Sequence, residues 1–169
     1  MRIATFAAIG ALAASLATAA QAETTLTVAT AGSQNMADYV TDYLGPKFEA
    51  ANPGVRVRVI GTGPGDAGSN AIMERIEAQM RAGAEADIDV AVVHQKPVGH
   101  MVESELLAKY VEQAETGKLV SSAAAKNALG VNVDGYVIPM FHSQTAWAYN
   151  PALVANPPRS YGELQSWVH

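Results

Sequence analysis

Hydrophobic and polar residues alternate along the chain in segments that predict strands separated by helices. Residues 25–30 and 55–60 have the period of two and the β-branched content of strands. Residues 88–93 are almost continuously apolar, which favours a buried parallel strand. Two further short strands are predicted at residues 136–141 and 145–149.

Apolar residues at a spacing of three or four predict helices between these strands. The first helix is expected to face the core with Met36, Val40, Leu44 and Phe48, and to be kinked or interrupted at Gly45-Pro46. The second is expected to begin at Ser69 or Asn70 and to bury Ile72, Met73, Ile76 and Met80. Residues 97–128 are expected to be helical, in at least two pieces broken near Thr116-Gly117.

The alternation of strands and helices predicts the fold class. A β-α-β-α-β-α order is typical of an α/β fold with a mainly parallel sheet, right-handed crossovers and helices on both faces. Ligands of open α/β sheets bind at the carboxyl ends of the strands. The loops that follow the predicted strands are therefore the first place to look for a site.

The N-terminal segment has the pattern of a cleavable export signal. Met1-Arg2 is positively charged, residues 3–19 are apolar, and Ala20-Gln21-Ala22 places small residues where signal peptidase reads them. The apolar run is rich in Ala and falls short of the ~20 strongly apolar residues that a membrane span needs. We therefore expect residues 1–22 to be a signal peptide.

The C-terminal residues predict the start of a helix. Ser160 can accept the amide hydrogen bond of Glu163, and Glu163 can reach back to the backbone of Ser160, as in a capping box. No helix stop signal follows before His169. This pattern suggests the N-terminal part of a larger protein.

Composition narrows the classes of partner. The chain has 11 Lys and Arg against 16 Asp and Glu, a formal charge of −5, and no cysteine. Long-range electrostatics therefore does not favour nucleic acid or an anionic lipid surface. Without cysteine the chain forms no disulfides, and this does not identify the compartment in which the protein works.

A glycine-rich segment between the second strand and the second helix resembles a nucleotide-binding loop in its spacing alone. Gly63, Gly65 and Gly68 fit G-x-G-x-x-G, but the acidic residues of the next strand, Asp87 and Asp89, stand at its start instead of its end. We interpret the loop as one that lets backbone approach a small ligand or another lobe, or as a plain connection.

The sequence shows no metal-ligand spacing and no nucleophile elbow. The four histidines, His94, His100, His142 and His169, are spread out, without the paired spacing of a zinc site. No cofactor is expected on this basis.

Several segments resemble those of the extracellular solute-binding proteins of ABC importers, and within them the iron, thiamine and polyamine group. They are residues 26–30 after the signal, 48–57 between helix and strand, 86–90, 105–110, 146–154 and 157–164. The most specific is the pair Ala146-Trp147-Ala148-Tyr149-Asn150-Pro151 and Pro157-Pro158-Arg159-Ser160-Tyr161.

The resemblance implies a type II periplasmic-binding-protein fold of two α/β lobes that clamp a solute between them. Residues 24–142 would form lobe one, nearly complete; residues 143–156 the crossing segment between lobes; and residues 157–169 the start of a truncated lobe two. It also implies a periplasmic, monomeric protein that captures a small-molecule solute and delivers it to an ABC permease in the inner membrane. An exported enzyme that uses the same fold is the alternative.

Within this frame, the solute-contacting residues of lobe one would follow its strands. They are expected to be Gly32, Ser33, Gln34, Asn35, Gly61, Thr62, Gly63, His94, Gln95, His142, Ser143 and Gln144. Ser33 could equally serve as a simple helix cap. The alternative for both His94 and His142 is an ordinary hydrogen-bonded loop histidine. Iron binders of the group usually place a His in the first of these loops, and its absence here counts against iron. A small organic ligand, an amine or an oxyanion remains open.

Overall fold

The computed structural model describes residues 23–141 and 146–167, so the predicted signal peptide lies outside the described residues. The chain divides between Val137 and Ile138 into two compact units. Each unit is described by itself below.

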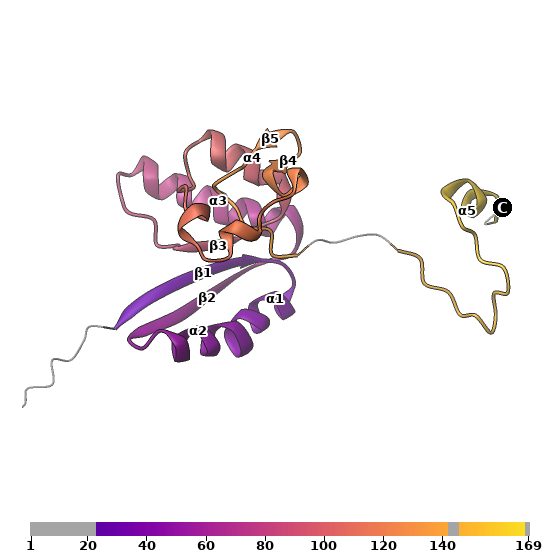
Figure 1. Cartoon of the computed structure of the whole chain (residues 1–169), viewed down its shortest axis with the longest axis horizontal. Helices are drawn as coiled ribbons and strands as arrows, with labels where there is room; N and C mark the ends of the chain where they lie inside the picture. Colours follow the sequence, from indigo (N-terminus) through magenta and orange to yellow (C-terminus); the bar gives the residue numbers. More distant parts are fainter. Residues whose placement is uncertain (1–22, 142–145, 168–169) are drawn as a thin grey trace, which may run out of the picture. The chain divides into compact units, whose positions relative to one another are not determined.

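The first unit is built on a parallel sheet of three strands. Strand β1 (Thr24–Ala31) lies between β2 (Val55–Gly63) and β3 (Val90–Val92), so that the order is β2-β1-β3. Val28 of β1 is in register with Val59 on one side and Val90 on the other. Helices cover both faces of this sheet (Figure 1), which confirms the predicted α/β class with a mainly parallel sheet.

Strand β3 is shorter than the predicted 88–93. The carboxylate of Asp89 accepts the backbone N–H of Thr27 at 2.7 Å, and the N–H of Asp89 donates to the Thr27 carbonyl at 3.0 Å. A side chain thus takes a position that a strand carbonyl would fill, and the ladder begins one residue later.

One face of the sheet is covered by a helix with a widened turn. It runs through α1 (Gln34–Tyr39), a π-helical turn η1 (Val40–Leu44) and α2 (Gly45–Ala51). Of the predicted kink or interruption at Gly45-Pro46, the interruption is wrong: the N–H of Gly45 bonds the Val40 carbonyl, five residues back, and the helix continues. A π turn holds one residue more than an α turn, so later residues are rotated by roughly 100°. Phe48, expected to be buried, is 44% exposed for this reason.

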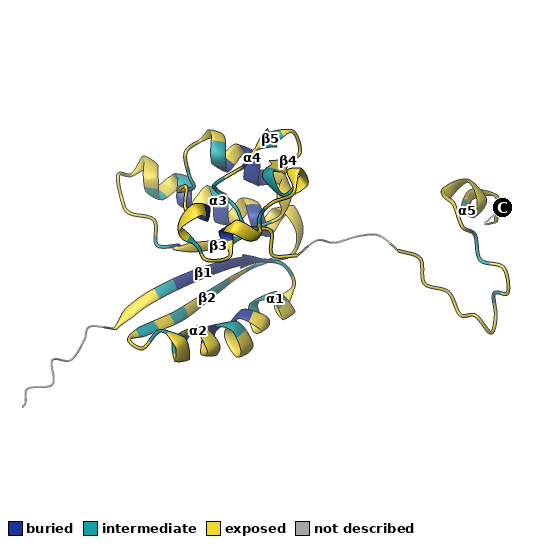
Figure 2. Ribbon diagram, in the orientation of Figure 1, coloured by how far each residue is buried: buried dark blue, intermediate teal, exposed yellow. Residues whose placement is uncertain are grey.

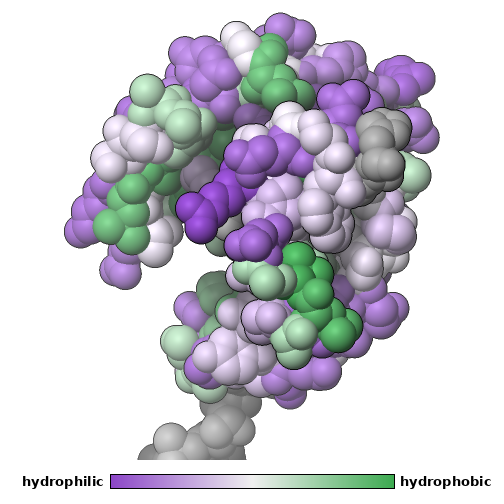
Figure 3. Space-filling view, turned by 90° about the vertical axis from the view of Figure 1, so that its right-hand side faces the viewer, coloured by the Kyte–Doolittle hydropathy of each residue, from purple (hydrophilic) through white to green (hydrophobic). Residues whose placement is uncertain are grey.

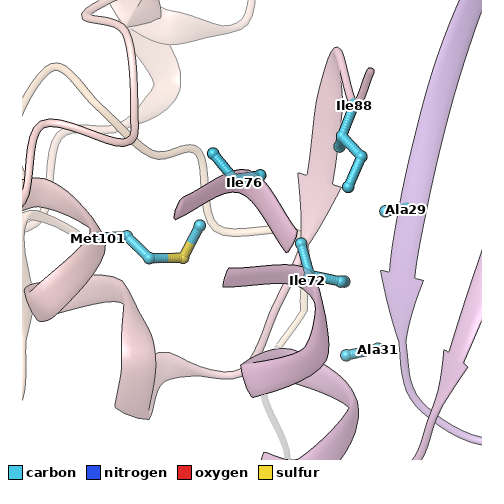
Figure 4. Packing of buried hydrophobic residues seen from close by; sticks show 6 residues of the cluster. All are labelled: Ala29, Ala31, Ile72, Ile76, Ile88 and Met101. Carbon is cyan, nitrogen blue, oxygen red and sulfur yellow. The ribbon is translucent and has the colours of Figure 1, made fainter. Parts of the chain in front are cut away.

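The other face carries the hydrophobic core. Helices α3 (Gly65–Arg81) and α4 (Gln95–Glu103) pack Ile72, Ile76 and Met101 against Ala29 and Ala31 of β1 (Figures 2 and 4). Helix α3 begins at Gly65, four residues before the predicted start. Met80, near its last turn, is 46% exposed instead of buried.

The region predicted as helix over 97–128 is helical only at its start. Helix α4 ends in a Schellman motif: the N–H of Leu106 bonds the Met101 carbonyl at 2.9 Å, and that of Glu105 bonds Val102 at 3.1 Å. Glu105 takes the left-handed φ of 56° that glycine usually occupies at this position, which is why the sequence did not reveal the stop.

Short 3₁₀ turns and a hairpin follow instead of further helix. They are η2 (Val111–Gln113), η3 (Gly117–Leu119), η4 (Ala123–Lys126), β4 (Asn127–Ala128) and β5 (Val131–Asn132). β4 and β5 pair antiparallel around Leu129 and Gly130, both with positive φ. Asn-Gly or Asp-Gly would have indicated this turn, whereas Leu-Gly does not.

The two late strands predicted from the sequence are not present among the described residues. Residues 136–141 and 146–149 are extended or irregular without a pairing strand, and Thr145 lies outside the description. Alternating apolar residues stabilise a strand only where a neighbouring strand accepts its backbone hydrogen bonds.

The second unit contains α5 (Tyr161–Trp167), capped nearly as predicted. The Glu163 N–H donates to the Ser160 hydroxyl at 3.1 Å, but the Glu163 carboxylate accepts the N–H of Arg159, at 2.6 Å, instead of that of Ser160. Trp147 and Tyr161 form an edge-to-face pair with ring centroids 5.2 Å apart.

The hydropathy of the surface can be followed in a space-filling view. Figure 3 shows hydrophilic residues over much of one face, with hydrophobic residues scattered among them. Within residues 23–141 and 146–167, no helix has both the length and the apolar character needed to cross a membrane.

Candidate solute-binding edge

The carboxyl ends of the three parallel strands bring most of the predicted site residues to one edge of the sheet. β1 leads through Gly32 and Ser33 into α1, β2 leads through Pro64 into α3, and β3 leads through Val93 and His94 into α4. The predicted residues at this edge are Gly32, Ser33, Gln34, Asn35, Gly61, Thr62, Gly63, His94 and Gln95. His142, Ser143 and Gln144 lie outside the described residues, so their place stays a prediction.

The first two loops are held together by their own backbone. The N–H of Gly32 donates to the Gly63 carbonyl at 2.8 Å. The Thr62 hydroxyl donates to the Gly68 carbonyl at 2.8 Å and lies 3.3 Å from the Thr30 carbonyl. Its single proton is therefore used in shaping the loop, and Thr62 is better placed to orient the loop than to donate to a solute.

The glycine-rich segment is explained by close packing within the loop. A Cβ on Gly68 would lie 1.9 Å from the Gly63 carbonyl oxygen, which no side chain can tolerate. Gly63 itself has a positive φ of 90°. The glycines thus let the loop pack closely against the first turn of α3, and the predicted approach to a ligand or another lobe stays a prediction.

Several exposed residues of the edge are polar and form no ion pair in the described part of the chain. Ser33, Asn35 and His94 are exposed, and neither Ser33 nor His94 makes a side-chain capping hydrogen bond to its helix in the part of the chain that the structure describes. The amino ends of the helices therefore keep backbone N–H groups and a partial positive charge at this edge.

The two glutamine side chains are partly engaged. The Gln34 amide donates to Asp38 at 2.8 Å, along the same helix, and the Gln95 amide lies 3.4 Å from the Asn127 carbonyl, which joins α4 to β4.

The structure adds an ion pair that the sequence did not indicate. Lys96 donates to Asp66 at 2.8 Å, which links the first turns of α3 and α4. The hydrogen bond and the negative charge of Asp66 raise the pKa of Lys96. Because both residues lie at the starts of helices far apart in sequence, no local spacing pointed to their contact.

A buried serine is the other residue that the sequence missed. Ser69 of α3 is 0% exposed, and its Oγ lies 2.9 Å from Nδ1 of His94 and accepts the His94 backbone N–H at 3.0 Å. The sequence predicts Ser69 only as a possible helix start. Nothing in its local sequence distinguishes a serine that supports a loop 25 residues away.

A metal centre has no support from the described side chains. Among residues 23–141 and 146–167, no group of three or more His, Cys, Asp or Glu side chains is placed to hold a metal ion. Besides the Lys96–Asp66 ion pair, the edge offers hydrogen bonding by polar side chains and backbone N–H groups.

Comparison with known proteins identifies the family. No curated protein matches the chain. Residues 32–168 match the family described as bacterial extracellular solute-binding protein, over a region that includes the loops at the carboxyl edge. The chain belongs to the bacterial extracellular solute-binding protein family.

Proposed function

We propose that this protein is the solute-capturing component of an ABC importer and that its carboxyl edge contributes to the solute site. It receives a small molecule outside the inner membrane and delivers it to a membrane permease. The observation that carries the proposal is the convergence of three strand-to-helix loops at one edge, with exposed Ser33, Asn35 and His94. Membership of a solute-binding family supports it.

The proposed route to this place is export by the N-terminal segment. Residues 1–22 have the charge, apolar run and small residues of a signal peptide, and cleavage after Ala22 would release the protein into the periplasm. The formal charge of −5 fits a monomeric carrier that meets a small solute instead of nucleic acid. The solute-binding family gives no support to the alternative of an exported enzyme.

The chemistry of the edge bears on the class of solute. Neutral hydrogen-bonding side chains and helix amino ends suit a small organic molecule or an oxyanion better than a metal ion, which prefers charged or imidazole clusters. We also propose that the protein is related to the iron, thiamine and polyamine group of solute-binding proteins, with iron disfavoured as its solute.

Screening for a stabilising solute tests the proposal. The full-length protein is heated in the presence of single compounds, because a ligand of the native state alone raises the midpoint of unfolding. Calorimetry then gives the affinity, and recovery of the compound unchanged separates a carrier from an enzyme.

A matched pair of histidine variants then locates the site. His94→Ala is expected to weaken binding about tenfold, in line with loss of one or two hydrogen bonds. His100→Ala is the control, since His100 lies on α4, the helix that His94 precedes, but pairs with Glu77 away from the edge. Equal effects of the two substitutions would contradict the proposed place of the site.

A further inference from the structure

The Ser69–His94 contact allows the proton positions of both side chains to be worked out. A serine hydroxyl has one proton and two acceptor lone pairs. In Ser69, one lone pair accepts the backbone N–H of His94 at 3.0 Å. The proton and the other lone pair remain, and the partners within reach are Nδ1 of His94 at 2.9 Å and the Gly65 carbonyl at 3.5 Å.

Two arrangements are possible. In the first, the Ser69 hydroxyl donates to Nδ1, and the His94 proton is on Nε2. In the second, Nδ1–H donates to Ser69, whose own proton must then reach the Gly65 carbonyl at 3.5 Å. A hydrogen bond of that length is weak. Ser69 is 0% exposed, and a buried hydroxyl proton without a good acceptor costs about 1–3 kcal/mol. The first arrangement is therefore favoured.

The position of the proton decides whether Nε2 of His94 is a donor or an acceptor. With Nδ1 occupied as an acceptor, the neutral ring presents Nε2–H, a donor, on an exposed residue at the carboxyl edge. We propose that Ser69 is a positioning residue that holds His94 as an Nε2–H donor, and that the solute offers this donor an acceptor oxygen of the carboxylate or phosphate class. The second half of the proposal rests on the proposed function, since it requires His94 to face the solute.

Helix α4, which His94 precedes, provides an internal control. His100 also has a serine beside it, but Ser104 is exposed and lies 3.3 Å from Nε2 and 3.5 Å from Nδ1, so it favours neither nitrogen. The firm contact of His100 is between its Nε2 and Glu77, at 2.9 Å. Removing the Ser104 hydroxyl therefore should not change the state of His94.

The first experiment reads the nitrogen states directly and needs no solute. Full-length protein labelled with ¹⁵N-histidine is observed by long-range ¹H–¹⁵N spectroscopy at alkaline pH, where imidazole is neutral, and His94→Gln assigns the signals. We expect Nδ1 of His94 to have a pyridine-like shift, which moves in Ser69→Ala as the nitrogen loses its donor. Ser104→Ala should leave it in place.

A milder variant covers the case in which Ser69→Ala fails to fold. Ser69→Cys keeps the shape of the side chain and a weak donor, so it should give a smaller shift in the same direction. A pyrrole-like Nδ1 in the wild-type protein, or His94 signals unchanged in the Ser69 variant that folds, would overturn the role of Ser69.

The second experiment tests the class of solute. Succinate, inorganic phosphate and putrescine are added separately while the Nε2–H signal of His94 is followed. We expect succinate or phosphate to move it and putrescine to leave it, with binding about threefold to tenfold weaker in Ser69→Ala. A response to putrescine alone, or to none of the three, would overturn the acceptor-oxygen class. Failure of the proposed function would give a different result: His94 would keep a pyridine-like Nδ1, but no solute would stabilise the protein.

Discussion

The two edges of the same parallel sheet carry different chemistry. At the amino edge, charged side chains pair with one another: Arg56 contacts Glu23 at 2.6 Å and Glu49 at 3.2 Å, and Arg75 contacts Asp87. At the carboxyl edge, the exposed Ser33, Asn35 and His94 carry hydroxyl, amide and imidazole groups. The ion pair Lys96–Asp66 lies there too, but it joins two helices and uses both of its charges on each other.

The difference separates a structural edge from a binding edge. Carboxylates at the amino edge also accept backbone N–H groups: Glu49 accepts from Val57 at 2.8 Å, which ties α2 to β2, and Asp89 accepts from Thr27 at 2.7 Å, which ties the start of β3 to β1. At the carboxyl edge the loops are organised by backbone, by buried Ser69 and by partly buried Thr62, which leaves the exposed side chains for a solute. Substitutions at the two edges should therefore have different consequences.

The largest expected effect is on stability, at Gly68 in the first turn of α3, which packs against the carboxyl-edge loop. Gly68→Ala places a Cβ 1.9 Å from the Gly63 carbonyl oxygen and must displace backbone. Such overpacking costs on the order of 3 kcal/mol or more. Chemical unfolding measures it. Gly54→Ala is the control: its φ is positive, at 92°, but the space around it is open, so we expect a cost of only about 1 kcal/mol. Similar losses for both would show that the loop is not tightly packed.

An intermediate effect is expected at the amino edge, on the pH dependence of stability. Hydrogen bonds from Arg75 and Gln79 lower the pKa of Asp87 from 3.8 to about 2. A carboxylate with a depressed pKa stabilises the folded state above its unfolded pKa, and the stabilisation is lost as the pH falls through its folded pKa. Asp87 should therefore contribute fully above about pH 4 and lose its contribution toward pH 2.

Thermal unfolding at several pH values checks this contribution. Asp87→Asn should reduce the change in stability between pH 4 and pH 2. Asp42→Asn, at an exposed position of η1, is the control and should not change the dependence of stability on pH. Parallel curves for the wild-type protein and Asp87→Asn would refute the contribution of this contact.

The smallest expected effect on stability is at Ser33. A true N-cap serine contributes about 1 kcal/mol, but the Ser33 side chain makes no capping bond in the described structure. Ser33→Ala should therefore change the free energy of unfolding by less than about 0.5 kcal/mol. Ser122→Ala should cost more, because the Ser122 hydroxyl does accept the N–H of Ala125 at 3.1 Å. The reverse order would identify Ser33 as a cap instead of a binding residue.

The sequence predicted the fold class because its strongest signals are local. The alternation in β1 and β2 and the apolar spacing of Ile72 and Ile76 in α3 need no knowledge of partners, and these elements were found. The carboxyl-edge loops could be named for the same reason, since a parallel α/β order dictates which loops meet.

Other features depend on contacts that sequence spacing does not reveal. The π turn before Pro46 preserved a helix expected to break, Glu105 took a left-handed conformation usual for glycine, and residues 136–141 formed no strand in the described structure without a partner. Ser69 belongs to this class as well. Its importance comes from His94, which the fold brings to it across 25 residues of chain.

The central claim is that solute binds at the carboxyl edge of the sheet. Hydrogen-exchange mass spectrometry of the full-length protein, with and without a solute found by the stabilisation screen, tests it most directly. We predict slower exchange in segments that contain residues 32–36, 62–66 and 93–97, and unchanged exchange at the amino edge around residues 54–57 and 84–88. Protection confined to the amino edge, or absent from all three carboxyl-edge loops, would contradict it.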